Sequence, residues 1–345
     1  MKAAVLTKVG CIEIMEHEIP QISDDEVLVH VEYVGVCGSD LHFFAEGGIG
    51  AAKIQEPRIL GHEACGRVEK VGKNVTDLKE GDNVVLDPGL SCGKCHYCRT
   101  GRYNLCTYAL KWFLGNPWTD GAFREYMAYP ADRTYKLPDS IPKIRAALIE
   151  PYCVALHAVE RSAAGYGQNA VVLGAGCIGL MTLMALKAHG INEIIVVDVI
   201  ESRLAKAVEL GASHIINAAK ENPVEKLKEL TEDIGVDLVF ETSGSIQAQA
   251  QTVEYLKKGG TITFVGFSSG QLVNYDISTL MRKEANIATV FRFANQHKKA
   301  IEQLADNPIE LEKIMPQIYK LDNIQQAIEE NIRDKDKVIK CVIEI

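Results

Sequence analysis

Alternating apolar and polar positions dominate the first third of the chain, and they predict short β-strands. The alternation is clearest at 26–38, 66–72 and 82–89, where glycine or proline ends each run. Short strands with frequent turn residues are typical of an antiparallel sheet that curls into a barrel. We therefore predict a mainly antiparallel, barrel-like β domain over residues 1–152.

The pattern changes after about residue 150, where apolar strand-like runs alternate with helix-like segments. The strand-like runs lie at 171–173, 194–198, 214–217, 237–241 and 261–266. Strands and helices that alternate in this way are typical of βαβ units and a parallel sheet. This part of the chain is predicted to be an α/β domain, a Rossmann-like doubly wound parallel sheet over residues 153–287.

The end of the chain, 288–345, is predicted to return to the first domain. Residues 286–293 have the pattern of one more strand, and 337–345 alternate like another. Helix-like segments lie between them. A chain of 345 residues is also longer than one hydrophobic core usually serves, which independently favours two domains.

Composition narrows the classes of function. The apolar content of 47% and the charged content of 24% are ordinary for a globular protein. A formal net charge of −9 without a basic block argues against binding to nucleic acid or to anionic membranes. The sequence has no run of about 20 apolar residues and no secretory signal pattern, so we expect a cytoplasmic protein.

A glycine pattern follows the first strand of the predicted parallel sheet. Gly174 allows a tight turn, Gly176 lets the backbone approach a pyrophosphate, and Gly179 lets helix and strand pack closely. Ile178 lies in the first helical turn, whose N–H groups and dipole would face the phosphates. The pattern predicts a dinucleotide site; a packing turn without a ligand and a site for S-adenosylmethionine are the alternatives.

An acidic residue, Asp198, ends the next strand. In this context a carboxylate accepts hydrogen bonds from the adenosine ribose and repels a 2′-phosphate, so NAD is favoured over NADP. Arg203 complicates the prediction, because a nearby arginine can hold that phosphate. We place it on the adenine side, since no second cation adjoins Asp198.

Four cysteines at short spacing, Cys92, Cys95, Cys98 and Cys106, predict a metal site. Four thiolates can surround one tetrahedral zinc ion at about 2.3 Å from each sulfur. Because cysteine fills all four positions, this zinc would be structural. An iron–sulfur cluster and free thiols are the alternatives.

Cys37 and the pair His62-Glu63 are weaker signals when each is taken alone, because a lone buried cysteine or histidine is usually structural. Their combination with the glycine pattern and the cysteine lobe resembles the zinc-containing medium-chain dehydrogenases. Within that family the polyol (sorbitol and xylitol) dehydrogenase branch is the most similar. The segments that carry the resemblance are 37–50, 61–72, 101–106, 147–158 and 290–295.

The resemblance implies a catalytic zinc held by Cys37, His62 and Glu63, which would make two zinc ions per chain. It implies that Glu150 either completes the ligand shell or holds a zinc-bound water. A carboxylate there gives an oxygen-rich site that suits two neighbouring hydroxyls of a polyol. Taken alone, Glu150 is also consistent with a solvated surface acid.

The resemblance further implies a proton relay through Ser39 and His42, from the substrate hydroxyl to solvent. A surface histidine is the alternative for His42. The polyol branch usually has tyrosine after this histidine, whereas this chain has Phe43, so a hydroxyl that contacts the substrate is missing. The aromatic segment 111–123 is consistent both with a pocket wall and with core packing.

Further cofactor and substrate contacts are also implied. Arg292 and Phe293 would close the site beside nicotinamide and substrate, and the arginine can donate several hydrogen bonds to polyol oxygens. A surface ion pair is the alternative for the arginine. The predicted cofactor contacts in this region are Val265, Gly266, Phe267, Phe291 and Arg292.

The expected activity is hydride transfer between NAD and a polyol C2 alcohol or its ketose, in a homotetramer or homodimer. Related dehydrogenases for butanediol, threonine or a sugar-alcohol phosphate are the nearest alternatives. A non-catalytic, crystallin-like protein is disfavoured, because it would not need an open zinc site. A metal-sensing regulator would need a basic DNA-binding element, and none is visible.

Overall fold

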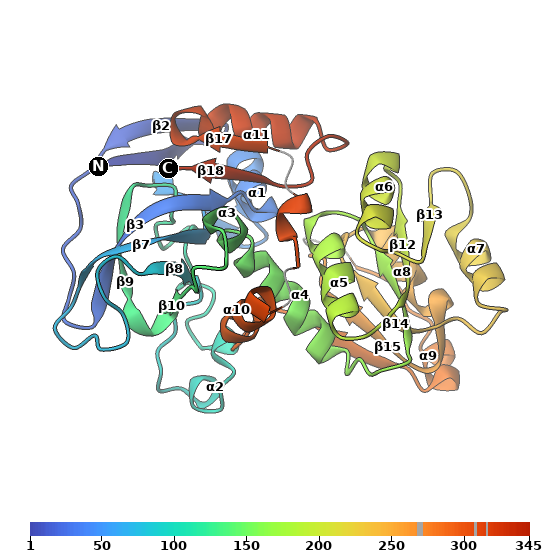
Figure 1. The fold of residues 1–345 in the computed structure, drawn as a ribbon. Coiled ribbons are helices and arrows are strands. Elements are labelled where there is room, and N and C mark those ends of the chain that lie inside the picture. The colour runs from blue at the N-terminus through green and yellow to red at the C-terminus, as the bar shows by residue number, and fades with distance from the viewer. Residues whose placement is uncertain (268–271, 307–308, 315–316) are drawn as a thin grey trace. The chain divides into compact units, whose positions relative to one another are not determined.

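The computed structural model describes residues 1–267, 272–306, 309–314 and 317–345. The chain forms two compact units (Figure 1). Unit 1 comprises Met1–Glu150 and Ala294–Ile345, and unit 2 comprises Pro151–Phe293. The sequence predicts these boundaries at 152/153 and 287/288.

Unit 1 is built mainly from antiparallel strands. Its largest sheet runs in the order β10-β8-β7-β3-β18-β17, with β9 also paired to β3. Smaller sheets are formed by β2-β1-β6 and by β4-β5. The strands are β1 (Lys2–Lys8), β2 (Cys11–Glu16), β3 (Glu26–Gly35), β4 (Gly48–Ile49), β5 (Ala52–Lys53), β6 (Arg58–Ile59), β7 (Glu63–Val71), β8 (Asn83–Leu86), β9 (Tyr126–Pro130), β10 (Thr134–Lys136), β17 (Gln317–Lys320) and β18 (Cys341–Glu344).

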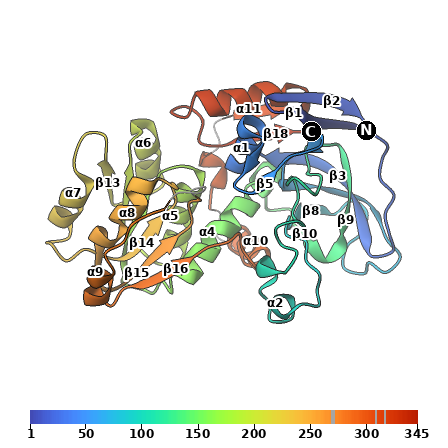
Figure 2. The same ribbon diagram turned by 180° about the vertical axis from the view of Figure 1, so that it is seen from behind.

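The end of the chain joins this sheet directly. Strand β18 pairs antiparallel with β3, where Val342 lies opposite Gly35, and β17 pairs parallel with β18. Cys341 and Ile343 of β18 share one apolar core with the amphipathic helix α11 (Ile324–Arg333), and the partly buried Tyr319 of β17 packs against that core. Figures 1 and 2 show the blue N-terminal and red C-terminal segments of unit 1 side by side.

The helices of unit 1 are short and mostly lie between strands. They are α1 (Gly38–Glu46), α2 (His96–Arg99), α3 (Lys143–Ala146), α10 (His297–Asp306) and α11, with single 3₁₀ turns η1 (Tyr103–Leu105), η2 (Ala131–Arg133), η3 (Leu311–Ile314) and η4 (Leu321–Asn323). Helix α4 (Ile149–Arg161) begins in unit 1 and continues into unit 2.

Unit 2 contains a six-stranded parallel sheet in the order β13-β12-β11-β14-β15-β16. The strands are β11 (Asn169–Leu173), β12 (Glu193–Asp198), β13 (His214–Asn217), β14 (Val236–Glu241), β15 (Leu256–Phe264) and β16 (Asn286–Thr289). The strand order reverses beside β11, which is where open α/β sheets bind ligands. The predicted α/β fold and the antiparallel β unit are both confirmed.

The helices of unit 2 connect these strands and pack on the sheet (Figures 1 and 2). They are α5 (Cys177–Ala188), α6 (Glu201–Glu209), α7 (Pro223–Leu230), α8 (Ile246–Tyr255) and α9 (Ile277–Lys283). The strand predicted over 286–293 is shorter than expected, because β16 ends at Thr289. The backbone of Arg292 has φ +53°, a left-handed conformation that cannot continue a strand.

No helix in the described part of the chain is both long and apolar enough to cross a membrane.

Candidate functional site

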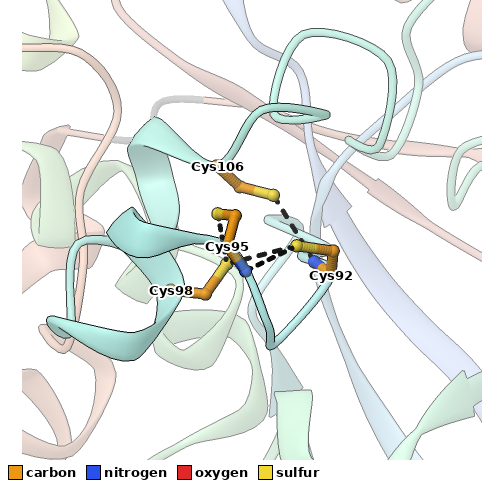
Figure 3. Close-up of side chains that lie close together, drawn as sticks. All are labelled: Cys92, Cys95, Cys98 and Cys106. Atoms are coloured by element: carbon orange, nitrogen blue, oxygen red, sulfur yellow. Dashed lines mark hydrogen bonds between the residues drawn. The ribbon is translucent and has the colours of Figure 1, made fainter.

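The four cysteines of the predicted lobe converge in unit 1 (Figure 3). Cys95 caps the single-turn helix α2, which carries Cys98, and Cys106 follows the 3₁₀ turn η1. All four sulfur atoms lie within 4.8 Å of one another. The backbone N–H of Cys95 donates to Cys92 Sγ at 3.3 Å, and that of Cys92 donates to Cys106 Sγ at 3.4 Å.

This donor set fits a zinc ion. Sulfur ligands at 2.3 Å in a tetrahedron are about 3.8 Å apart, and here Cys92 and Cys98 Sγ are separated by 3.9 Å and Cys95 and Cys98 Sγ by 3.5 Å. Hydrogen bonds from the backbone N–H groups of Cys98 and Thr107 lower the pKa of Cys95 to about 5. A low pKa favours the thiolate, which is the form that binds a metal.

A second cluster lies elsewhere in unit 1 and unites Cys37, His62 and Glu63. Their ligand atoms lie within 4.8 Å of one another. Cys37 is the N-cap of α1, and Glu63 begins β7 directly after His62. A thiol, an imidazole and a carboxylate leave one position of a tetrahedron open, which is typical of a catalytic rather than a structural zinc site.

A buried acid that the sequence did not single out braces this cluster. Asp40 is fully buried, and its carboxylate accepts hydrogen bonds from the N–H of Cys37 at 2.9 Å and of Gly61 at 3.1 Å. Its Oδ1 also lies 3.8 Å from Nδ1 of His62. Asp40 therefore fixes the backbone at Cys37 and next to His62, and its carboxylate also faces the His62 imidazole.

Glu63 occupies a space that depends on a glycine and a lysine. Gly35 on β3 lies opposite Glu63 on β7. A Cβ at Gly35 would lie 2.0 Å from Glu63 Oε2. That oxygen forms an ion pair with Lys340, whose Nζ also donates to the Val36 carbonyl at 2.8 Å. Glu63 Oε1 is buried and has no hydrogen-bond partner in the described ranges. A bound cation would satisfy this oxygen.

Glu150 lies in the first turn of α4 and is only 5% exposed. Burial raises the pKa of its carboxyl well above the usual value. The charge of His62 lowers this pKa, whereas Glu63 and Cys37 raise it further. These influences show that Glu150 lies near the cluster, although it is outside the group of atoms within 4.8 Å.

Burial also raises the pKa of the Cys37 thiol to about 12, and the nearby Glu63 adds to this effect. Without a cation the thiol is therefore neutral. A metal ion would reverse this preference, because its charge stabilises the thiolate. The cluster thus has the donor types and electrostatics of a site completed by a cation.

The predicted relay residues both lie on α1. Ser39 contacts Cys37 through its side chain. The His42 side chain is 58% exposed, and its Nδ1 lies 2.8 Å from Glu46 Oε1. Phe43 is 5% exposed within the apolar core of unit 1. Phe113, from the aromatic segment, packs its ring 5.1 Å from that of His62.

The predicted glycine turn of unit 2 connects β11 to α5. Gly174 has φ +100°, and Gly176 is the N-cap of α5. A Cβ on Gly179 would lie 1.8 Å from the Gly174 carbonyl oxygen, whereas a Cβ on Gly176 would meet only Arg203 at 3.7 Å. Gly179 is therefore needed for packing, and Gly176 leaves its backbone open to a ligand. Ile178 lies in the first turn of α5.

Asp198 ends β12 and is tied to this turn. Its Oδ2 accepts a hydrogen bond from Ala175 N–H at 2.6 Å, and its Oδ1 accepts from Val199 and Ile200 N–H. The guanidinium of Arg203 lies beside Gly176. Each carboxylate oxygen has two lone pairs, so one acceptor position of Oδ2 remains for a ribose hydroxyl.

The other predicted cofactor residues of unit 2 follow β15 and β16. Val265 and Gly266 are half-buried and Phe267 is exposed. Phe291 is 40% exposed, with the guanidinium of Arg292 4.9 Å from the centre of its ring. Phe293 is buried.

Two of the residues around the second cluster were missed by sequence analysis for different reasons. Asp40 lies inside the segment that carries the family resemblance, and an acid at a helix N-terminus was a signal that could have been used. Lys340 is at the far end of the chain from Glu63, and no local pattern relates them.

Two family profiles match this chain. The family profile for the alcohol dehydrogenase GroES-like domain matches residues 23–139, and that for zinc-binding dehydrogenase matches 177–306. Sorbitol dehydrogenase of Bacillus subtilis is 38% identical over 99% of this chain and 97% of its own length.

Several solved structures are similar over the whole chain, and two of them serve as examples. One is an oxidoreductase of unknown specificity from Escherichia coli, with 41% identity, a TM-score of 0.95, and coverage of 100% of this chain and 99% of the other. The other is an alcohol dehydrogenase from Escherichia coli CFT073 complexed with NADH, with 29% identity, a TM-score of 0.93 and the same coverage.

Proposed function

Because the chain belongs to the family of zinc-binding alcohol dehydrogenases, we propose that it interconverts the C2 secondary alcohol of a polyol and the matching ketose, with NAD as cofactor. The observation that carries the proposal is the buried cluster of Cys37, His62 and Glu63 with the acid Glu150 beside it. The sorbitol dehydrogenase relative supports a polyol as the substrate.

We assign the catalytic zinc to Cys37, His62 and Glu63, and the structural zinc to the four cysteines of the lobe. When bound, zinc supplies a Lewis acid that polarises the substrate hydroxyl, and NAD supplies the hydride acceptor. Glu150 either completes the metal shell or holds a water there. Its raised pKa suits a group that must tolerate a change of charge nearby.

The remaining residues bind the two reactants and move the proton. Ser39 and His42 pass the hydroxyl proton to solvent, and the exposed imidazole of His42 is well placed to release it. Arg292 donates hydrogen bonds to the other hydroxyls of the polyol, beside Phe293. The buried Phe43 offers no hydroxyl group, which leaves the identity of the polyol to experiment.

NAD binds unit 2 in this proposal. Its pyrophosphate lies against Gly176 and the first turn of α5, which includes Ile178, and Asp198 accepts hydrogen bonds from the adenosine ribose. Arg203, Val265, Gly266, Phe267 and Phe291 make the remaining contacts. The repulsion between Asp198 and a 2′-phosphate is the basis for preferring NAD over NADP.

The decisive experiment mixes the zinc-loaded protein with NAD or NADP and a panel of sorbitol, xylitol, 2,3-butanediol, threonine and a sugar-alcohol phosphate, and follows absorbance of the reduced cofactor. We expect NAD reduction with a polyol. Reduction only with butanediol, threonine or the phosphate ester would identify that compound, and not a polyol, as the substrate. No reduction with any compound would refute the activity.

Glu150→Ala tests the assignment of that acid. Turnover should fall at least about tenfold, on the scale of one lost transition-state interaction, while NADH affinity stays the same. Unchanged turnover would remove Glu150 from the site. A homotetramer or homodimer and a cytoplasmic location remain part of the proposal; light scattering of the purified protein and fractionation of the source cells test them.

A further inference from the structure

A buried carboxylate in unit 2 has no place in the chemistry described so far. Glu241 is the last residue of β14 and is 0% exposed. No cation pairs with it in the ranges that the structure describes; its carboxylate is satisfied by neutral donors instead. A buried acid is costly unless it is fully hydrogen-bonded, so its presence at the carboxyl end of this strand requires an explanation.

The carboxylate holds the turn that follows it, residues 241–244. Oε1 of Glu241 accepts three hydrogen bonds, from Ser243 N–H at 2.8 Å, Ser243 Oγ at 2.5 Å and Gly244 N–H at 3.0 Å. Oε2 accepts a longer bond from Gln249 Nε2 at 3.4 Å. One side chain thus fixes the conformation of the whole turn, including Gly244 with its φ of +68°.

On one side this turn packs against the glycine turn of the dinucleotide site. Thr242 Oγ1 donates to the carbonyl oxygens of Leu173 at 2.9 Å and Gly174 at 3.1 Å. A Cβ on Gly174 would lie 2.9 Å from Ser243 Cβ, and one on Gly179 would lie 2.8 Å from Thr242 Oγ1. The turn therefore has no freedom to move without displacing the pyrophosphate-binding backbone.

On the other side the turn packs against the end of β15. The N–H groups of Val265 and Gly266 donate to the backbone carbonyl of Glu241 at 2.8 and 2.9 Å. A Cβ on Gly266 would lie 2.2 Å from Gly244 N and 2.7 Å from Glu241 Oε2. The segment that begins at Val265 is thus held at the same edge of the sheet as the glycine turn.

We propose that Glu241 is a positioning residue of the dinucleotide site: by fixing residues 241–244 it sets the spacing between the glycine turn and the segment 265–267. The inference rests on the proposed function, because it assumes that both segments contact NAD. In this proposal Glu241 acts through the turn and not by contact with NAD. The role explains why an acid, rather than an apolar residue, ends this strand.

The test compares NADH affinity, by fluorescence titration, in the zinc-loaded wild type and two variants. Glu241→Ala leaves four donors without this acceptor, the three that bind Oε1 and Gln249 Nε2. It should weaken NADH binding about tenfold or more, the scale of one or two lost hydrogen bonds. Glu241→Gln retains a carbonyl oxygen that can accept the three bonds, so it should restore affinity to within about threefold of wild type.

Two further measurements separate positioning from general damage. At saturating NAD, the KM for the polyol and the zinc content of Glu241→Ala should match wild type, because only the cofactor site is altered. The control is Glu254→Ala, which removes an exposed acid from α8 in the same unit; its NADH affinity should be unchanged.

The inference is overturned if Glu241→Ala folds and binds NADH within twofold of wild type, or if polyol KM and NADH affinity deteriorate together. If Glu241→Ala does not fold, Ser243→Ala decides the question, because it removes the hydroxyl that donates to Glu241 Oε1 and accepts from Ser245 N–H. About threefold weaker NADH binding supports the inference, and unchanged binding refutes it. A wild type that binds no NADH would instead refute the proposed function.

Discussion

Lys340 and Glu63 form a buried ion pair whose loss should destabilise unit 1 strongly. The lysine is 3% exposed and the glutamate 1%. Replacing Lys340 with methionine keeps an unbranched side chain of similar length but removes the ammonium group. The Glu63 carboxylate and the Val36 carbonyl, which both face Nζ, are then left without this donor in an apolar environment.

The magnitude follows from the burial of both groups. Removing one partner of a buried ion pair costs about 3–5 kcal/mol, because the other charge remains buried. That is a large fraction of the 5–15 kcal/mol by which a typical domain is stable. Neutralising the acid as well, in Lys340→Met with Glu63→Gln, should show a coupling of about 1–3 kcal/mol between the two sites.

The assay is urea unfolding followed by circular dichroism, on zinc-loaded and on chelator-treated protein. The decrease in the free energy of unfolding caused by Lys340→Met should be smaller with zinc, since a cation bound to Glu63 replaces the ammonium as its partner. Lys320→Met is a matched control, because Lys320 pairs with Glu344 at a site where its side chain is 66% exposed, and exposed pairs contribute about 0–1 kcal/mol.

If Lys340→Met lowers the free energy of unfolding of the chelator-treated protein by less than about 1 kcal/mol, the reasoning is refuted. Such a result would mean that Glu63 becomes protonated or hydrated at little free-energy cost. An equal decrease in the free energy of unfolding with and without zinc would instead argue against a metal contact to Glu63.

Three other predictions concern separate parts of the molecule. Cys95→Ser should lose one of two zinc ions per chain in metal analysis and lower the melting temperature while NADH binding persists; retention of both ions would contradict the lobe as a zinc site. Gly179→Ala should abolish NADH binding or folding, because its Cβ would meet a carbonyl oxygen at 1.8 Å, and wild-type affinity would exclude this packing. Partial burial raises the pKa of Glu312, but its bonds from Arg145 outweigh this and hold the pKa below the usual 4.5. The pair therefore stabilises the fold above about pH 4.5 and loses its effect as the pH falls through the lowered pKa, so the stability difference between wild type and Arg145→Ala should vanish in acid; a pH-independent difference would contradict the ion pair.

Local patterns in the sequence were sufficient for the class of each unit. Period-two alternation marks the strands of unit 1, and alternating strand and helix segments mark the parallel sheet of unit 2. These patterns are legible because side-chain direction is fixed by local backbone geometry. The exception is the end of β16. The strand-like pattern continues through Phe293, but the strand ends at Thr289 and Arg292 has a left-handed backbone conformation.

The metal donors were also visible in the sequence, to different degrees. The four cysteines lie within 15 consecutive positions, so chain spacing alone brings them together. Cys37 and His62 are on separate elements, and only the resemblance to a family suggested that they meet. The structure adds that they do meet, in a setting where burial keeps the thiol neutral without a cation.

The sequence by itself determined the two kinds of domain, the glycine turn and the residue types able to bind zinc, because these depend on periodicity and short-range spacing. Only the tertiary structure decided which groups surround them. Asp40 braces the donor backbone, Lys340 pairs with Glu63, and Glu241 joins two turns of the cofactor unit. Such partners are selected by the free-energy cost of burying charge, which depends on three-dimensional surroundings that no local pattern encodes.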